Sequence, residues 1–230
     1  MMKSQRQFWH ILFFLCLCLV AGSVRAQGRN PCPGLVIGRV HYSGGGDWYN
    51  DPSAIPNLAT FIKKHTNVAI EEREKRLTML DETLFSHPVL FLTGHGRIKF
   101  GLKERERLRA YLLLGGFLYV DDDYGLDESF RTVMKKVFPE KELLELPFSH
   151  EIYHNHFTFA GGPPKIHKHD NQSPRGFGMF DDKGRLMLYY TFETSISDGW
   201  SDSGLNGDAE DVREKALRMG TNIIVYALTH

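Results

Sequence analysis

The chain has 230 residues, of which 28 are basic and 28 acidic, so its formal net charge is zero. A chain this close to neutral, with no block of basic residues, is a poor partner for nucleic acid and for anionic membrane surfaces. Hydrophobic residues make up 42% of the sequence, which at this length is enough for one domain with a sizeable core.

The first 26 residues predict a secretory signal peptide. Lys3 and Arg6 precede a short apolar run over 11–22, and Val24-Arg25-Ala26 places small residues before a cleavage point. The run is shorter than the roughly 20 apolar residues that a transmembrane helix needs. We therefore expect cleavage after Ala26, a single domain over 27–230 that is periplasmic or secreted, and no stable membrane insertion. An uncleaved membrane anchor is the alternative.

A glycine-rich loop follows the first predicted strand, which is the compact apolar run over 35–40. Gly45 and Gly46 allow a ligand to approach the backbone closely. The loop lacks the Gly-Lys-Ser/Thr of a phosphate-binding loop, and the dinucleotide-binding fingerprint is absent. We expect the two glycines, Asp47 and Trp48 to contact a flat polar ligand such as a sugar. Packing of the aromatic side chains on the core is the alternative.

Helical and extended patterns alternate after this loop. Apolar residues at helical spacing predict a helix over 53–65, and residues 68–70 predict a short second strand. The charged stretch 71–76 is expected to be a solvated surface. A third strand is predicted over 89–93, where the residues are again apolar.

The third predicted strand ends in Gly94-His95-Gly96. Ligands of open parallel sheets bind beyond the carboxyl ends of the strands, so His95 is expected to face that crevice. Gly94 and Gly96 are expected to leave backbone N–H groups available, as in an oxyanion-type site. The alternative is a tight turn in which His95 only forms a nearby hydrogen bond.

Three adjacent aspartates follow the strand that we expect at the centre of the sheet. A helix over 103–114 is predicted to end at Gly115-Gly116, and the apolar run 117–120 then predicts a buried parallel strand. Asp121, Asp122 and Asp123 come next. Their charges repel one another, so cations, backbone N–H groups or a metal ion must hold them. We expect the functional site at this point.

The remaining predicted elements are a helix over 127–138, a β-hairpin with strands 175–180 and 185–191, and a last helix over 208–228. A loop with acidic residues around Trp200 precedes the last helix. Trp200 is expected to be exposed and to bind the ligand together with the loop around Trp48.

Three histidines lie within residues 150–156. They do not form a zinc signature, because the chain has no His-Glu-x-x-His and no cysteine pair near them. If the segment is extended, His150, His154 and His156 share one face. The sequence identifies no cofactor, and a divalent metal is the less favoured explanation, since isolated histidines more often satisfy hydrogen bonds.

Several segments resemble the bacterial DUF4159 family, a domain of unknown function. They are residues 42–49, 92–96, 115–122, 150–154 and 220–223. At greater distance the chain resembles the class I glutamine-amidotransferase-like fold, which includes the ThuA-like group linked to sugar metabolism. This resemblance implies an α/β, flavodoxin-like parallel sheet with helices on both faces, to which a β-hairpin is added near the C-terminus.

The chain departs from the amidotransferase pattern at the nucleophile. Asp121 and Asp122 stand where that family has its cysteine, and His150 and Glu151 are adjacent instead of forming a His-x-Glu pair. Without a thiolate, glutamine hydrolysis by that route is excluded.

Two functions are consistent with these residues. The first is an exported binding module for a small polar or carbohydrate-like ligand or a cell-envelope protein partner. The second is a hydrolase or isomerase in which Asp121 or Asp122 is the nucleophile or general base, His95 or His150 is the proton partner, and a divalent cation assists. A carboxylate of Asp121 or Asp122 within about 5 Å of a histidine nitrogen in an accessible pocket would favour the second. A structural component of an envelope complex is a third alternative.

Overall fold

The computed structural model describes residues 34–167 and 172–230, so the predicted signal peptide and its cleavage point lie outside the described part of the chain. The strands are β1 (Leu35–Val40), β2 (Ile70–Leu77), β3 (Val89–Leu92), β4 (Phe117–Asp121), β5 (Leu144–Glu145), β6 (Arg175–Phe180) and β7 (Leu186–Phe192). The helices are α2 (Ala54–His65), α3 (Leu102–Leu113), α4 (Asp127–Val137) and α5 (Glu210–Thr229), with short 3₁₀ turns η1 (Leu84–Ser86), η2 (Glu151–Tyr153) and η3 (Asp198–Trp200).

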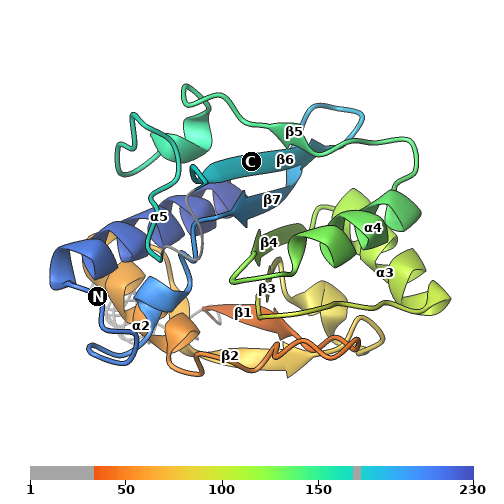
Figure 1. Ribbon diagram of the computed structural model, residues 1–230. Coiled ribbons are helices and arrows are strands. Elements are labelled where there is room, and N and C mark those ends of the chain that lie inside the picture. The colour runs from red at the N-terminus through yellow and green to blue at the C-terminus, as the bar shows by residue number, and fades with distance from the viewer. Residues whose placement is uncertain (1–33, 168–171) are drawn as a thin grey trace, which may run out of the picture. The chain divides into compact units, whose positions relative to one another are not determined.

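All seven strands form one sheet in the order β2-β1-β3-β4-β7-β6-β5 (Figure 1). The first five are parallel to one another. At one edge β6 pairs antiparallel with β7, and β5 pairs antiparallel with β6. The parallel part has the strand order of flavodoxin-like folds. The predicted fold class is therefore confirmed, including the C-terminal hairpin and the central place of β4.

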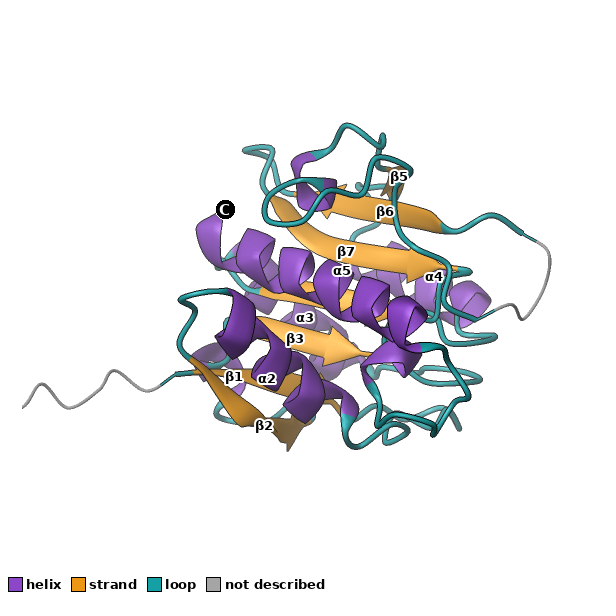
Figure 2. Cartoon of the chain, turned by 90° about the vertical axis from the view of Figure 1, so that its left-hand side faces the viewer, coloured by secondary structure: helices purple, strands orange, loops and turns teal. Residues whose placement is uncertain are grey.

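Helices cover both faces of the sheet. Figure 2 shows α2 and α5 on the near face, with α3 and α4 behind the strands. Ile55, Leu58 and Ile62 of α2 belong to one buried apolar cluster, and Phe130 and Met134 of α4 belong to the other. Because β3 lies inside the sheet between β1 and β4 and has apolar clusters on both faces, it is buried at all four of its residues.

The second strand differs from its prediction. It was predicted over 68–70, but it runs from Ile70 to Leu77 and includes the charged stretch, most of which is exposed as expected of a solvated surface. β2 lies at the edge of the sheet, where charged side chains are tolerated and discourage pairing with another chain. Because of these charges, the sequence pattern does not identify residues 71–77 as part of a strand.

The histidine segment is not extended. Residues 151–153 form η2, and His150 Nδ1 accepts a hydrogen bond from Ile152 N at 3.2 Å. The Asn222 side chain donates to the carbonyls of Ile152 and Phe157 at 3.0 and 2.7 Å and so holds the turn and the following loop against α5.

Within residues 34–167 and 172–230, none of the helices combines the length and the apolar character that a membrane-crossing helix requires.

Candidate functional site

The candidate site lies where the strand order reverses, between β1 and β3. From β1 the chain passes through α2 to β2, and from β3 it passes through α3 to β4, which lies on the other side. Such a switch point leaves a crevice beyond the carboxyl ends of the two strands. Residues 41–50 and 94–96 follow these two strands, and residues 121–123 end the neighbouring β4.

His95 joins the loops at this edge. Its Nδ1 lies 3.0 Å from Asp47 Oδ2 and 3.2 Å from Asp123 Oδ2. The His95 side chain is 47% exposed and that of Asp47 is 34% exposed, whereas Asp123 is buried. The structure thus brings together three of the predicted site residues, with the imidazole at the surface and one carboxylate beneath it.

Gly46 and Gly94 allow the two loops to touch. Gly94 has φ of 135°, and a Cβ there would lie 2.5 Å from Tyr42 Oη. A Cβ at Gly46 would lie 2.7 Å from the carbonyl oxygen of His95. These glycines are needed because the two loops of the chain approach each other closely at these positions, and they leave no free space there for a ligand.

Two backbone donors of the second loop are used inside the protein. Gly96 N donates to Tyr124 O at 3.0 Å, and His95 N donates to Asp47 Oδ1. The N–H groups of His95 and Gly96 are therefore not available to a ligand, whereas an oxyanion-type role of the Gly94 N–H stays a prediction. Gly45, in contrast, faces open space, since an added Cβ would meet no atom within 4 Å.

Asp121 is a structural residue. It is fully buried, and its carboxylate accepts hydrogen bonds from Thr191 Oγ1, Thr194 Oγ1 and both N and Oγ of Ser197 at 2.6–3.0 Å. Burial raises the pKa of Asp121, and these hydrogen bonds act in the opposite direction. The prediction that Asp121 is a catalytic nucleophile or base is wrong, because it ties β4 to the segment after β7 and has no access to solvent.

Asp122 is largely occupied by the start of α4. Its Oδ1 accepts a hydrogen bond from Leu126 N at 2.9 Å, and its Oδ2 accepts one from Tyr190 Oη at 3.3 Å. Burial raises the pKa of Asp122 to about 6, against the lowering effect of the Leu126 hydrogen bond. Asp122 therefore fixes Leu126, the residue before α4, and the hydrogen bonds of its carboxylate within the described residues go to Leu126 and Tyr190.

Asp123 is the aspartate that meets the histidine. Its Oδ2 also accepts a hydrogen bond from Asn50 Nδ2 at 2.7 Å. Burial, followed by the charges of Asp198 and Asp121, raises the pKa of Asp123 to about 9. Its carboxyl group therefore takes up a proton more readily than that of a free aspartate.

Two further aspartates, which sequence reasoning missed, complete the cluster. Asp51 precedes α2 and Asp198 begins η3, and one carboxylate oxygen from each lies within 4.8 Å of the other and of an Asp123 oxygen. Asp198 Oδ2 is 2.7 Å from His167 Nδ1, and this hydrogen bond is the main reason why the pKa of His167 rises to about 9. Their separation in sequence hides this grouping. The acidic residues around Trp200 were the available signal.

An acidic hollow of about 330 Å³ lies beside this cluster. Five acidic residues contribute to its lining, namely Asp122, Asp123, Asp127, Glu128 and Glu193. Carboxylates only accept hydrogen bonds, so the hollow suits a ligand that donates them or carries positive charge.

The two predicted ligand-binding tryptophans have different environments. Trp48 is partly buried and stacks on His41 with ring centroids 4.1 Å apart. Trp200 is 2% exposed, and its Nε1 donates to Ala216 O at 2.9 Å. The prediction that Trp200 is an exposed ligand-binding residue is wrong, because its ring packs in the core against Phe91 and Tyr119.

His150 lies at the opposite end of the strands from the aspartates. Its ring is next to Phe180 and Tyr226. Phe180 pairs with Leu186 at the start of β7, so this is the amino end of the parallel strands. The prediction that His150 is a proton partner of the aspartates is wrong, since they lie at the carboxyl end.

The stability of the fold is expected to fall as His150 takes up a proton. Burial, and to a lesser extent His230, lowers the pKa of His150, although Glu151 acts in the opposite direction. The unfolded chain therefore binds this proton more readily, so the free energy of unfolding decreases as the pH falls through the unfolded-state pKa of about 6.5. Urea unfolding at pH 7.5 and pH 5 measures the change. His150→Asn should reduce this slope, and an unchanged slope would contradict the assignment.

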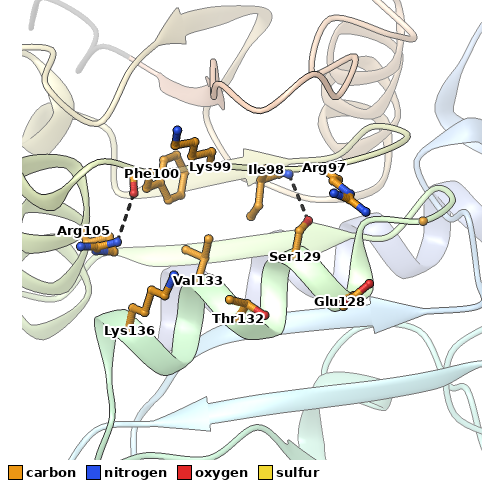
Figure 3. Close-up of a pocket in the computed structure, with 11 residues that line it drawn as sticks. Arg97, Ile98, Lys99, Phe100, Arg105, Glu128, Ser129, Thr132, Val133 and Lys136 are labelled. Carbon is orange, nitrogen blue, oxygen red and sulfur yellow. Dashed lines mark hydrogen bonds between the residues drawn. The ribbon is translucent and has the colours of Figure 1, made fainter.

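A second hollow, of about 260 Å³, lies between α4 and residues 97–100 (Figure 3). Its lining has four basic side chains, Arg97, Lys99, Arg105 and Lys136. Arg105 Nη1 donates to Phe100 O at 3.4 Å, and Ile98 N donates to Ser129 Oγ at 3.0 Å. None of the residues that we predicted for the site contributes to it.

The fold and this edge define a doubly wound α/β domain with an acidic, histidine-containing crevice at its switch point. The chain belongs to the DUF4159 family, a domain of unknown function, whose model matches residues 36–228. The family resemblance seen in the sequence is thereby confirmed, whereas the more distant relation to amidotransferases stays a prediction. No curated protein matches the sequence.

Proposed function

We propose that this chain is an exported binding domain for a small polar ligand, held at the edge formed by Asp47, His95 and Asp123. The observation that carries the proposal is the meeting of these three side chains at the switch point, next to an acidic hollow. Export rests on the signal-like first 26 residues. Binding is favoured over catalysis by Asp121 and Asp122 because both carboxylates are engaged in holding the fold.

The chemistry of the lining selects the ligand class. A hollow lined by several carboxylates repels phosphates and carboxylic acids, and it favours hydroxyl or ammonium groups as donors. Its volume of about 330 Å³ falls at the lower end of the range of about 300–1,000 Å³ for small-molecule sites. A monosaccharide or an amino sugar fits these requirements.

We expect a neutral or amino sugar to raise the unfolding temperature of the purified protein. A ligand at 100 times its dissociation constant stabilises by about 2.7 kcal/mol. His95→Ala and Asp47→Asn should each weaken binding of that sugar by about tenfold or more, because one hydrogen bond to a charged group contributes about 1.5–3 kcal/mol. Asp182→Asn, at an exposed position of the β6–β7 turn, is the matched control and should bind as the wild type does.

Stabilisation by phosphate or citrate but by no sugar or amine would contradict this ligand chemistry. If none of these small molecules stabilises the protein, a cell-envelope protein partner becomes the occupant to test by crosslinking at Gly45→Cys, since the Gly45 backbone faces open space.

Acid–base catalysis is the second candidate function, and one observation favours it. The distance between His95 Nδ1 and Asp123 Oδ2, 3.2 Å, lies within hydrogen-bond reach, and the His95 ring is half exposed. The partner is thus Asp123, instead of the Asp121 or Asp122 that we expected. Turnover of nitrophenyl glycosides or esters that is lost in His95→Ala, while sugar binding survives, would establish this function over simple binding.

A further inference from the structure

Three carboxylates from distant parts of the chain converge beneath the crevice. Asp51 lies before α2, Asp123 follows β4 and Asp198 starts η3, and the ligand oxygens of the three all lie within 4.8 Å of one another. Asp123 and Asp198 are 2% and 6% exposed, whereas Asp51 is partly exposed. Burial of several like charges at one point is costly unless something positive joins them.

Two buried oxygens at this place are acceptors without a donor. Asp198 uses Oδ2 for the hydrogen bond with His167, and its Oδ1 is buried with no hydrogen-bond partner among the described residues. Asn50 Oδ1 is also buried and without a partner in the described part of the chain, although Asn50 Nδ2 donates to Asp123. Buried polar atoms nearly always have a hydrogen-bond partner, so these two oxygens indicate a position for a donor or a cation.

Two imidazoles reach the cluster: His95 Nδ1 lies 3.2 Å from Asp123 Oδ2, and His167 Nδ1 lies 2.7 Å from Asp198 Oδ2. The guanidinium of Arg39 donates to the backbone carbonyl of Asp51 at 3.1 Å, so that hydrogen bond does not reach the Asp51 carboxylate. Beside these contacts, Asp198 Oδ1 stays without a hydrogen-bond partner among the described residues. A cation held by the three carboxylates would satisfy this oxygen and offset their mutual repulsion.

We propose that Asp51, Asp123 and Asp198 bind one hard divalent cation such as Ca²⁺, Mn²⁺ or Mg²⁺. Ca²⁺ binds oxygen at about 2.3–2.6 Å, so two ligands on opposite sides of it lie roughly 4.8 Å apart. The observed spread of the carboxylate oxygens fits one such coordination sphere. All donors are oxygens, which favours these ions over Zn²⁺ or Cu²⁺.

This site goes beyond the sugar-binding proposal and stands without it, although Asp123 belongs to both. The cation would sit behind His95, on the protein side of the crevice, and would hold Asp123 in its ionised form. It would also join η3 and the loop before α2 to the end of β4, which are the three segments that the carboxylates come from.

The test is cation binding by the purified protein after treatment with a chelator. Isothermal titration with Ca²⁺, Mn²⁺ and Mg²⁺ should show one site per chain for at least one of them, and that ion should raise the unfolding temperature. Zn²⁺ serves as the comparison ion, and added NaCl controls for ionic strength. Absence of a one-to-one site for all three hard ions would overturn the proposal.

Variants assign the site to these residues. Asp51→Asn and Asp198→Asn should each lower the affinity for the cation by about tenfold or more, which corresponds to about 1.4 kcal/mol of binding free energy. Asp51 has φ of 47°, a conformation that asparagine adopts readily, so Asp51→Asn preserves the backbone even if Asp198→Asn fails to fold. Asp202→Asn, an exposed aspartate near η3, is the matched control. Equal affinity of Asp51→Asn and Asp202→Asn would overturn the assignment.

The cation proposal and the sugar proposal can be tested separately. Asp47 is not among the proposed cation ligands, so Asp47→Asn should lose sugar affinity and keep the cation. Cation binding without any sugar binding would support this inference and contradict only the proposed function.

Discussion

Replacing Trp200 with alanine is expected to lower the free energy of unfolding by about 3–5 kcal/mol, the usual cost of removing a large aromatic side chain from a core. Trp200 is the largest of the fully buried side chains. Its ring lies 5.4 Å from that of Phe91 and 5.8 Å from that of Tyr119, and α5 approaches it so closely that a Cβ at Gly220 would lie 2.8 Å from the indole. Alanine at position 200 would leave a cavity between α5 and β4. Because both elements contact the indole, a small shift of one of them cannot close this cavity.

Trp48→Ala is the matched control for this substitution. Trp48 is partly exposed, stacks on His41 and packs at the margin of a core cluster, so its loss should cost less than that of Trp200, about 0.5–3 kcal/mol. Equilibrium urea unfolding of both variants measures the difference. Equal losses would mean that Trp200 does not hold α5 on the sheet.

The frame of the domain was predictable because its signals are local. Gly115-Gly116 ends a helix, and the run 117–120 has no polar residue, so a buried strand at the centre of a parallel sheet was the expected result. The rule that ligands bind beyond the carboxyl ends of such strands then placed His95 and Asp123 at the same edge, and they lie 3.2 Å apart.

The roles of the individual aspartates were not predictable in this way. Whether Asp121, Asp122 or Asp123 reaches the crevice depends on which segments supply hydrogen bonds to each. Those partners, such as Ser197 for Asp121, lie far away in sequence. The same reason hid Asp198 and placed Trp200 wrongly, since a loop with aromatic and acidic residues has the same pattern whether it faces solvent or the core.

Arg39 connects the fold to the candidate site, and Arg39→Met is expected to destabilise the protein by about 3–5 kcal/mol, as removal of one partner of a buried ion pair usually does. The side chain is 1% exposed, and its Nε donates to Glu74 Oε2 at 2.7 Å. Its two terminal nitrogens donate to the carbonyls of Asn50 and Asp51, both at 3.1 Å. Arg39 therefore fixes the loop that presents Asp51, and methionine would leave these carbonyls without their donor.

Arg76→Met is the control that separates this role from simple pairing with Glu74. Arg76 Nε lies 2.7 Å from Glu74 Oε1, yet the Arg76 side chain is 52% exposed. An exposed pair contributes about 1 kcal/mol or less, so this variant should unfold nearly as the wild type does. Hydrogen exchange should accelerate in residues 47–53 of Arg39→Met alone. If the two variants lose equal stability, or if that loop stays protected in Arg39→Met, the loop does not depend on Arg39 and Asp51 is positioned by other contacts.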